Sequence, residues 1–143
     1  MRFMVIRKAD RDTEAGMMPT ERLVTEMVKY NEEMINAGVM LAGDGLQPSS
    51  KGARVKFHGG KPTIIDGPFA EAKELIAGYS IIDVKSRDEA LEWMKRWPQI
   101  DGNGEVELEL RQLYEADDFG AEFTPELRQH EENLRAKAAA RQK

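Results

Sequence analysis

The chain has 143 residues, of which 41% are hydrophobic and 33% are charged, a composition typical of one soluble globular domain. It has no cysteine, which excludes disulfides and sulfur-based zinc sites, and its two histidines disfavour a histidine metal site, so we expect no metal, although carboxylate sites stay open. No nucleotide-binding glycine motif is present, so we expect no cofactor. The net charge of -5 and the lack of a basic run predict no direct binding to nucleic acid. No apolar run approaches the roughly 18 residues of a membrane helix, and the first run is too short for a signal peptide, so a cytoplasmic protein is expected.

The first half of the chain predicts a strand, a helix and a second strand. The apolar run from Met1 to Arg7 is typical of a strand buried on both faces. Helical spacing then predicts a helix of about 17 residues that begins after Thr20 and stops at Gly38. Its apolar stripe is Leu23, Met27, Tyr30 and Met34, which Val24, Val28 and Ile35 are expected to widen. Residues 39 to 46 predict the second strand, where Gly43 and Gly45 indicate a bulge or a close backbone approach.

The middle of the chain predicts a β-hairpin. Residues 54 to 58 and 63 to 65 form its arms, Gly59-Gly60 is a tight turn, and Pro62 favours an edge position or a strand start. Alternation places Val55 and Phe57 on one face.

Three more elements follow. Residues 78 to 84 predict a strand, and a capping box from Ser86 to Glu89 begins a helix that ends before Pro98. Residues 105 to 111 alternate strictly, so Val106, Leu108 and Leu110 face one way and Glu105, Glu107, Glu109 and Arg111 the other.

This order of elements predicts an α+β domain over residues 1 to 115, a ferredoxin-like antiparallel sheet with two helices on one face and an inserted hairpin. The second sheet face stays uncovered, which suggests that a second copy covers it in a homodimer. Residues 116 to 143 form a polar extension whose helix begins at Thr124-Pro125 and runs to about Ala140. This helix either lies along the partner subunit or is largely solvated.

The densest group of polar residues follows the hairpin, at Asp66-Gly67-Pro68-Phe69, called the DGPF segment below, and the turn after it. Asp66, Lys73 and Glu74 are candidate catalytic groups, because proximity and burial would shift their pKa values towards acid–base work. The structural alternative, favoured on spacing alone, is a turn that anchors the hairpin, with Asp66 capping the next helical turn.

Four further residues are candidate ligand contacts: Phe69, Tyr79, His58 and Arg54. The structural alternatives are favoured for two of them: His58, at the tip of the hairpin, as a solvated side chain, and Phe69 as a residue that fills the core.

The run from Asp66 to Glu74, followed by Gly78-Tyr79, resembles the signature of the YCII-related proteins, in the branch called DGPF-domain proteins. Residues 38 to 43, 46 to 49 and 88 to 90 support the likeness, which covers roughly residues 1 to 115. The resemblance implies a dimeric ferredoxin-like α/β barrel. Some relatives of this shape are lyases or isomerases that act on ring compounds without a metal, and others are linked to extracytoplasmic-function sigma factors.

The chain departs from the family pattern at two places. Ala72 stands where the motif commonly has threonine, so a hydroxyl is not essential there. In shorter YCII proteins a histidine of the first helix is paired with an aspartate, but this chain has no histidine between Thr20 and Gly38. A basic partner for Asp66 would therefore be Lys73, His58 or a group of the other subunit.

Two functional hypotheses follow. The first is a small-molecule binding protein or cofactor-independent lyase or isomerase, with its pocket beside the DGPF segment. The alternative is a noncatalytic interaction protein, such as an accessory to an extracytoplasmic-function sigma factor.

Overall fold

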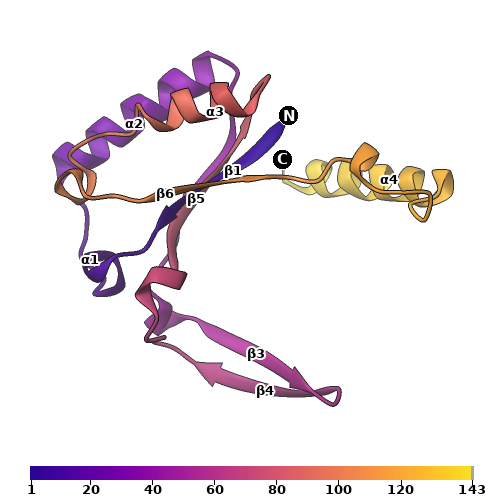
Figure 1. Cartoon of the computed structure of the whole chain (residues 1–143), viewed down its shortest axis with the longest axis horizontal. Coiled ribbons are helices and arrows are strands. Elements are labelled where there is room, and N and C mark those ends of the chain that lie inside the picture. Colours follow the sequence, from indigo (N-terminus) through magenta and orange to yellow (C-terminus); the bar gives the residue numbers. More distant parts are fainter. Residues whose placement is uncertain (143) are drawn as a thin grey trace. The chain divides into compact units, whose positions relative to one another are not determined.

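The computed structural model describes residues 1–142 and divides into two compact units, Met1–Gln112 and Leu113–Lys143. Unit 1 is built on a four-stranded antiparallel sheet with the strand order β2-β5-β1-β6 (Figure 1). Its strands are β1 (Arg2–Lys8), β2 (Met40–Gly45), β5 (Ile76–Asp83) and β6 (Leu108–Gln112). One helix connects β1 to β2 and another connects β5 to β6, so the predicted ferredoxin-like α+β fold is confirmed.

Both long helices of unit 1, α2 (Glu21–Asn36) and α3 (Arg87–Met94), pack on the same face of the sheet (Figure 1). Their apolar sides meet alternate residues of β1 and β5, as the two-residue period of a strand requires. The buried core consists of Phe3, Val5, Tyr30, Met34, Val39, Ile82, Val84 and Ala90. The Tyr30 hydroxyl is satisfied there because it donates to the Trp93 carbonyl over 2.7 Å.

Local signals set the ends of α2. Thr20 Oγ1 accepts the Leu23 N–H over 3.1 Å, and Gly38 has a φ of 73°, which favours glycine beyond a helix end. One prediction about this helix is wrong, because Val24, Val28 and Ile35 do not widen the buried stripe. They are 45%, 58% and 58% exposed, since the sheet is reached only by the side of α2 that carries Tyr30 and Met34.

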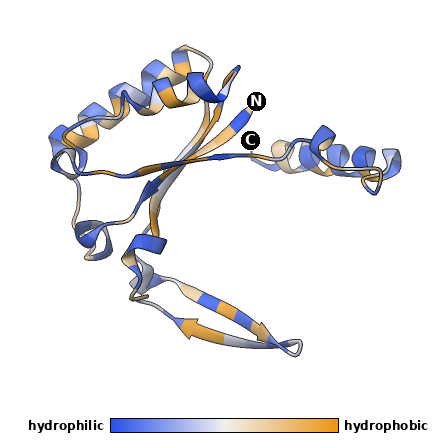
Figure 2. Cartoon of the chain, in the orientation of Figure 1, coloured by the Kyte–Doolittle hydropathy of each residue, from blue (hydrophilic) through white to orange (hydrophobic). Residues whose placement is uncertain are grey.

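The hairpin of β3 (Ala53–His58) and β4 (Lys61–Asp66) forms a separate two-stranded sheet. Gly59 and Gly60 have φ values of 57° and 79°, which suits a tight turn with the right twist for a hairpin. All residues of both strands are exposed. Figure 2 shows hydrophobic residues on both strands where the hairpin projects from the sheet.

Two further differences from the prediction concern local geometry. A short helix, α1 (Arg11–Glu14), lies between the first strand and Thr20, where no helix was predicted, because Asp10 caps it by accepting the Thr13 N–H over 2.9 Å. The last strand begins at Leu108 rather than at Glu105. Gly102, Asn103 and Gly104 all have positive φ values, so the chain turns there before it can join the sheet.

Unit 2 contains α4 (Pro125–Arg141), which begins where it was predicted. Thr124 Oγ1 accepts the Leu127 N–H over 3.2 Å, and the expected pair of Arg135 and Glu131 is 2.8 Å apart. Leu127 and Leu134 are each 51% exposed, so α4 has no broad buried stripe. Among residues 1–142, no helix is long and apolar enough to span a membrane.

Candidate functional site

The candidate site is the sheet face of unit 1 that points away from α2 and α3, called the open sheet face below. Because Phe3 and Val5 face the helices, their neighbours Met4 and Ile6 face the other way. The strand register places Ile81 beside Met4, and Tyr79 beside Ile6. These four residues form an apolar floor in the middle of the sheet, in which Ile6 is 9% exposed and the others are half-buried.

A polar pair lies on this floor. Tyr79 and Asp44 are register partners on β5 and β2, and the Tyr79 hydroxyl donates to Asp44 Oδ2 over 3.1 Å. This hydrogen bond and the negative charge of Asp44 raise the pKa of Tyr79 above its ordinary value of 10.0. The phenol is therefore a neutral, oriented group with a lone pair to offer a ligand.

The open sheet face also carries a charged pair on its other edge strand. Glu109 lies opposite Ile6, and Arg111 lies opposite Met4. The Arg111 guanidinium is 3.5 Å from Glu109 Oε2. The floor is thus flanked by Asp44 on one side and by a Glu–Arg pair on the other.

The DGPF segment directly follows β4, and its backbone is held against residues 49 to 52. The Gly67 N–H donates to the Gly52 carbonyl over 3.0 Å, and the Phe69 N–H donates to Ser49 Oγ over 3.1 Å. A Cβ at Gly67 would lie 1.7 Å from the Ser49 carbonyl oxygen, so only glycine fits there. The Gly67–Pro68 peptide bond is cis.

Ser49 is itself fixed by Glu14 of α1. Its hydroxyl donates to Glu14 Oε2 over 2.5 Å, and its N–H donates to Glu14 Oε1 over 3.1 Å. The Glu14 carboxylate therefore orients the Ser49 hydroxyl, and a lone pair of the Ser49 Oγ is left to accept the Phe69 N–H. We call Glu14, Ser49, Gly67 and Phe69 the clasp.

Of the predicted site residues, the structure brings Arg54 and Phe69 together. The Arg54 guanidinium carbon lies 3.8 Å from the centre of the Phe69 ring, a cation–π contact at the root of the hairpin. Tyr79 lies on the open sheet face, and His58 is exposed beside the hairpin turn.

The side chains of the three predicted acid–base groups form no hydrogen bond or ion pair with one another in the part of the chain that the structure describes. Asp66 is exposed at the end of β4, and Lys73 and Glu74 are exposed on a 3₁₀ turn over Ala72–Glu74. Asp66 does not cap that turn, because Glu71 precedes it and no side chain caps it. The clasp holds the segment through its backbone instead.

Comparison with protein families decides what kind of domain this is. The model of the YCII-related domain matches residues 1–116. The chain belongs to this family. Its match thus includes the open sheet face, the clasp and the hairpin.

Two similar proteins add limited information about this YCII-related chain. An uncharacterised protein of Rhizobium meliloti (strain 1021) is 32% identical over 75 residues, which is 52% of this chain and 60% of that protein. The chain therefore spans less than two thirds of that relative's length. A solved structure of 5-chloro-2-hydroxyhydroquinone dehydrochlorinase from Burkholderia phenoliruptrix AC1100, in complex with 2,5-dihydroxybenzoquinone, has a TM-score of 0.41 and 12% identity. That match covers 82% of this chain and 98% of that chain, and a score this low carries no information on function.

Sequence reasoning missed Asp44, Glu14 and Ser49. The sequence did contain a signal for Asp44. It lies between Gly43 and Gly45, two glycines that indicate a close approach to a neighbouring strand. Glu14 and Ser49 gave no signal, because their contact joins residues 35 positions apart.

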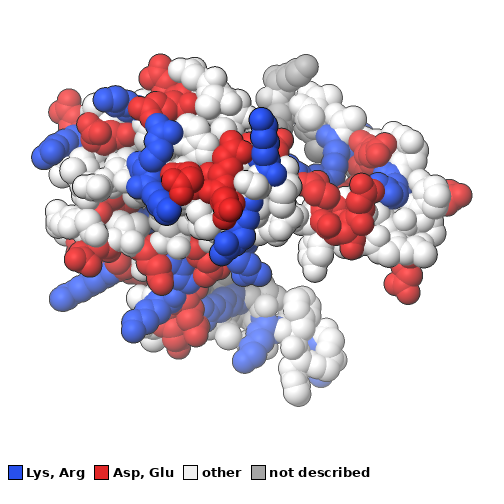
Figure 3. Space-filling model, turned by 45° about the horizontal axis from the view of Figure 1, so that its top comes forward, with Lys and Arg blue, Asp and Glu red and all other residues white. Residues whose placement is uncertain are grey.

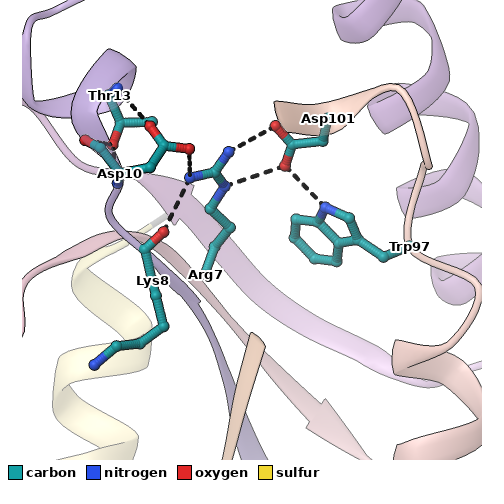
Figure 4. Close-up of polar contacts among 6 residues, drawn as sticks. All are labelled: Arg7, Lys8, Asp10, Thr13, Trp97 and Asp101. Carbon is teal, nitrogen blue, oxygen red and sulfur yellow. Dashed lines mark hydrogen bonds and ion pairs between the residues drawn. The ribbon is translucent and has the colours of Figure 1, made fainter. Parts of the chain in front are cut away.

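A buried ionic network lies at one end of the YCII-related sheet (Figure 4). Arg7 is 8% exposed and forms a bidentate contact with Asp101, with Nε 3.1 Å from Oδ2 and Nη2 2.8 Å from Oδ1. Its third nitrogen, Nη1, donates to Asp10 Oδ2 over 3.0 Å and to the Lys8 carbonyl over 2.9 Å. The Trp97 Nε1–H also donates a hydrogen bond to Asp101 Oδ2 over 2.9 Å. Every group in this network has a partner, so we interpret it as structural.

The network also shifts two pKa values. Burial alone would lower the pKa of Arg7, but the hydrogen bonds and charges of Asp101 and Asp10 raise it above its ordinary value. Burial likewise favours neutral Asp10, but the Thr13 N–H and the Arg7 guanidinium lower the pKa of Asp10 below 3.8.

We expect Asp10 to make the stability of the protein depend on pH at acid values. Because its pKa is lowered by folding, its contribution is complete above pH 3.8 and is lost as the pH falls below that value. Asp10→Asn should therefore be less stable than the parent at pH 6, and the difference should shrink towards pH 2. Urea unfolding at pH 6, 4, 3 and 2 measures this, with Asp12→Asn, an exposed neighbour, as the control. A difference that stays constant with pH would contradict the expectation.

Figure 3 shows acidic and basic side chains interspersed on the face in view. In residues 1–142, no group of three or more His, Asp or Glu side chains is placed to hold a metal ion.

Proposed function

We propose that the chain is a small-molecule binding protein whose ligand lies on the open sheet face, and that it acts as a cofactor-independent lyase or isomerase if it is an enzyme. The observation that carries this proposal is the Tyr79–Asp44 hydrogen bond on an apolar floor. Small-molecule sites typically combine an apolar lining with a few oriented polar groups, and this face has both.

The ligand that fits best is a small ring compound with hydroxyl or carbonyl oxygens. A flat ring suits the apolar floor of Met4, Ile6 and Ile81. The Tyr79 hydroxyl can accept a hydrogen bond from a hydroxyl group of the ring, or donate one to a ring carbonyl in place of its bond to Asp44. Asp66, Lys73 and Glu74 are the proposed acid–base groups, since the loop that carries them leads directly into β5 and Tyr79. Phe69, His58 and Arg54 are the proposed additional ligand contacts.

The proposal includes a second copy of the chain. The open sheet face is apolar at its centre, and an isologous dimer through this face would enclose the ligand between two sheets. We also propose that the chain belongs to the DGPF-domain branch, which the DGPF segment supports, and that it is a cytoplasmic protein. The sigma-factor alternative stays a hypothesis, since no described contact and no similar protein supports it.

Tyr79→Phe should weaken ligand binding by about tenfold, the effect of one lost hydrogen bond to the ligand. The probe is hydroquinone, titrated into the ¹⁵N-labelled protein and followed by amide chemical shifts. We expect the largest shifts on β1, β2 and β5, and weaker binding in the variant at an unchanged melting temperature. Tyr114→Phe is the matched control, because Tyr114 is 73% exposed in unit 2. Shifts confined to other surfaces, or equal affinity in both variants, would refute the proposal.

Asp66→Asn tests the acid–base role. Asp66 is exposed and its carboxylate has no hydrogen-bond partner among residues 1–142, so the change should leave the free energy of unfolding within about 0.5 kcal/mol of the parent. Hydroquinone binding or turnover should fall nevertheless. Full binding together with a clear loss of stability would instead assign Asp66 to the clasp.

A further inference from the structure

The hairpin of β3 and β4, called the arm below, lacks the packing that such an element needs. Each strand has six residues, and every one of them is exposed. A two-stranded ribbon alone is marginally stable in water and becomes stable on further strands or on a helix. The arm is nevertheless regular, with a two-glycine turn and paired strands. A regular element without a packing partner in its own unit indicates a partner outside it.

The two faces of the arm differ in chemistry. Val55 pairs with Ile64 and Phe57 pairs with Pro62, so these four residues share one face. Val55, Phe57 and Ile64 are 55%, 68% and 70% exposed, which is unusual for large apolar residues that lie side by side. The opposite face carries the basic residues Arg54, Lys56, His58 and Lys61.

The charge of the arm is opposite to that of the remaining chain. The arm, residues 53 to 66, holds three Lys or Arg and one Asp, so it carries +2. The other residues hold 18 basic and 25 acidic side chains and carry -7. A second copy of this chain is therefore an electrostatically favourable partner for the arm.

The clasp fixes the root of the arm. Gly67 and Phe69 hold the end of β4 against residues 49 to 52, and Arg54 of β3 stacks on the Phe69 ring. The arm therefore leaves the domain in one direction, which lowers the entropy lost on docking.

A matching surface exists on α2. Val24, Val28 and Ile35 form an exposed apolar stripe on this helix, and Glu21 and Glu32 border it. The stripe extends over about 16 Å, from the helical rise of 1.5 Å per residue, and a six-residue strand extends over about 20 Å. Figure 1 shows the arm and α2 at opposite sides of unit 1, so the arm does not reach the α2 of its own chain.

We propose that the apolar face of the arm docks on the α2 stripe of a second copy. The helix supplies the packing partner that the ribbon lacks. The basic side chains lie on the opposite face of the arm, so Glu21 and Glu32 attract the arm through its net positive charge and not through direct ion pairs. Reciprocal docking gives a closed two-fold assembly. This contact uses neither the open sheet face nor its ligand, so it stands independently of the proposed function.

Cross-linking tests the contact directly, because the chain has no cysteine of its own. Ile64→Cys is placed in one preparation and Val24→Cys, Val28→Cys or Ile35→Cys in a second, and the two are mixed and oxidised. We expect a disulfide-linked species of twice the chain mass with at least one α2 position. The matched control replaces the second chain by Asp88→Cys, an exposed position on α3. No linked species, or equal linkage in the control, would overturn the proposal.

Sedimentation velocity gives a second, independent measurement. Phe57→Asp in the arm and Val28→Asp on α2 should each weaken self-association by about tenfold or more. Hydroquinone binding to the open sheet face should persist, which separates this result from a failure of the proposed function. Self-association that is as strong in both variants as in the parent, or binding of the monomer to vesicles of anionic lipid through the arm, would overturn the proposal.

Discussion

Arg7→Met should lower the free energy of unfolding by about 3–5 kcal/mol, the usual cost of breaking a buried ion pair from one side. The change removes three donors and leaves Asp101, 8% exposed, with a carboxylate that the Trp97 N–H alone would satisfy. Asp10 would lose its contact with the guanidinium as well. Urea unfolding followed by far-UV circular dichroism measures the effect.

Two controls separate the buried charge from lost packing. In the double variant Arg7→Met with Asp101→Leu, both charges are gone, so much of the lost stability should return. Lys95→Met breaks the exposed Lys95–Glu92 pair and should leave stability close to that of the parent. If Arg7→Met were as stable as Lys95→Met, the network would not be a structural element.

Gly67→Ala should cost about 3 kcal/mol or more, at or above the upper end of the usual cost of overpacking. The new methyl group would lie 1.7 Å from the Ser49 carbonyl oxygen, and neither side of this contact is a flexible side chain. The two segments would have to separate, which breaks the Gly67–Gly52 and Phe69–Ser49 hydrogen bonds. Amide hydrogen exchange should show the loss of protection first in β3 and β4.

Gly45→Ala is the matched control for this experiment. A Cβ at Gly45 meets no atom within 4 Å, so the same chemical change should alter stability by about 0.5 kcal/mol or less. Equal stability of the two variants would show that the clasp does not hold the root of the arm.

Local patterns were sufficient to predict most of the fold. An apolar run marked β1, and period-two alternation marked β3 and β6. The Leu23 to Met34 spacing marked α2, and Ser86 and Thr124 marked the starts of α3 and α4. Alternation also predicted too early a start for the last strand. Residues 105 to 107 alternate, but the positive φ values of the three residues before Glu105 turn the chain, and the strand begins only at Leu108.

The spatial contacts of the site could not be predicted in the same way. The sequence shows that Val24 and Val28 lie near the apolar side of α2, but only packing decides which side meets the sheet. The bond from Glu14 to Ser49 depends on two loops meeting, and no local pattern encodes that. The DGPF segment was identified from its sequence as important, while its backbone contacts and the Tyr79–Asp44 pair required the structure.

The most direct test of the central claim is a crystal structure of the protein soaked with hydroquinone. The proposal predicts the ring on the floor of Met4, Ile6 and Ile81, with a ring oxygen within hydrogen-bond distance of the Tyr79 hydroxyl. A ring bound elsewhere, with the Tyr79–Asp44 pair facing bulk solvent, would contradict it.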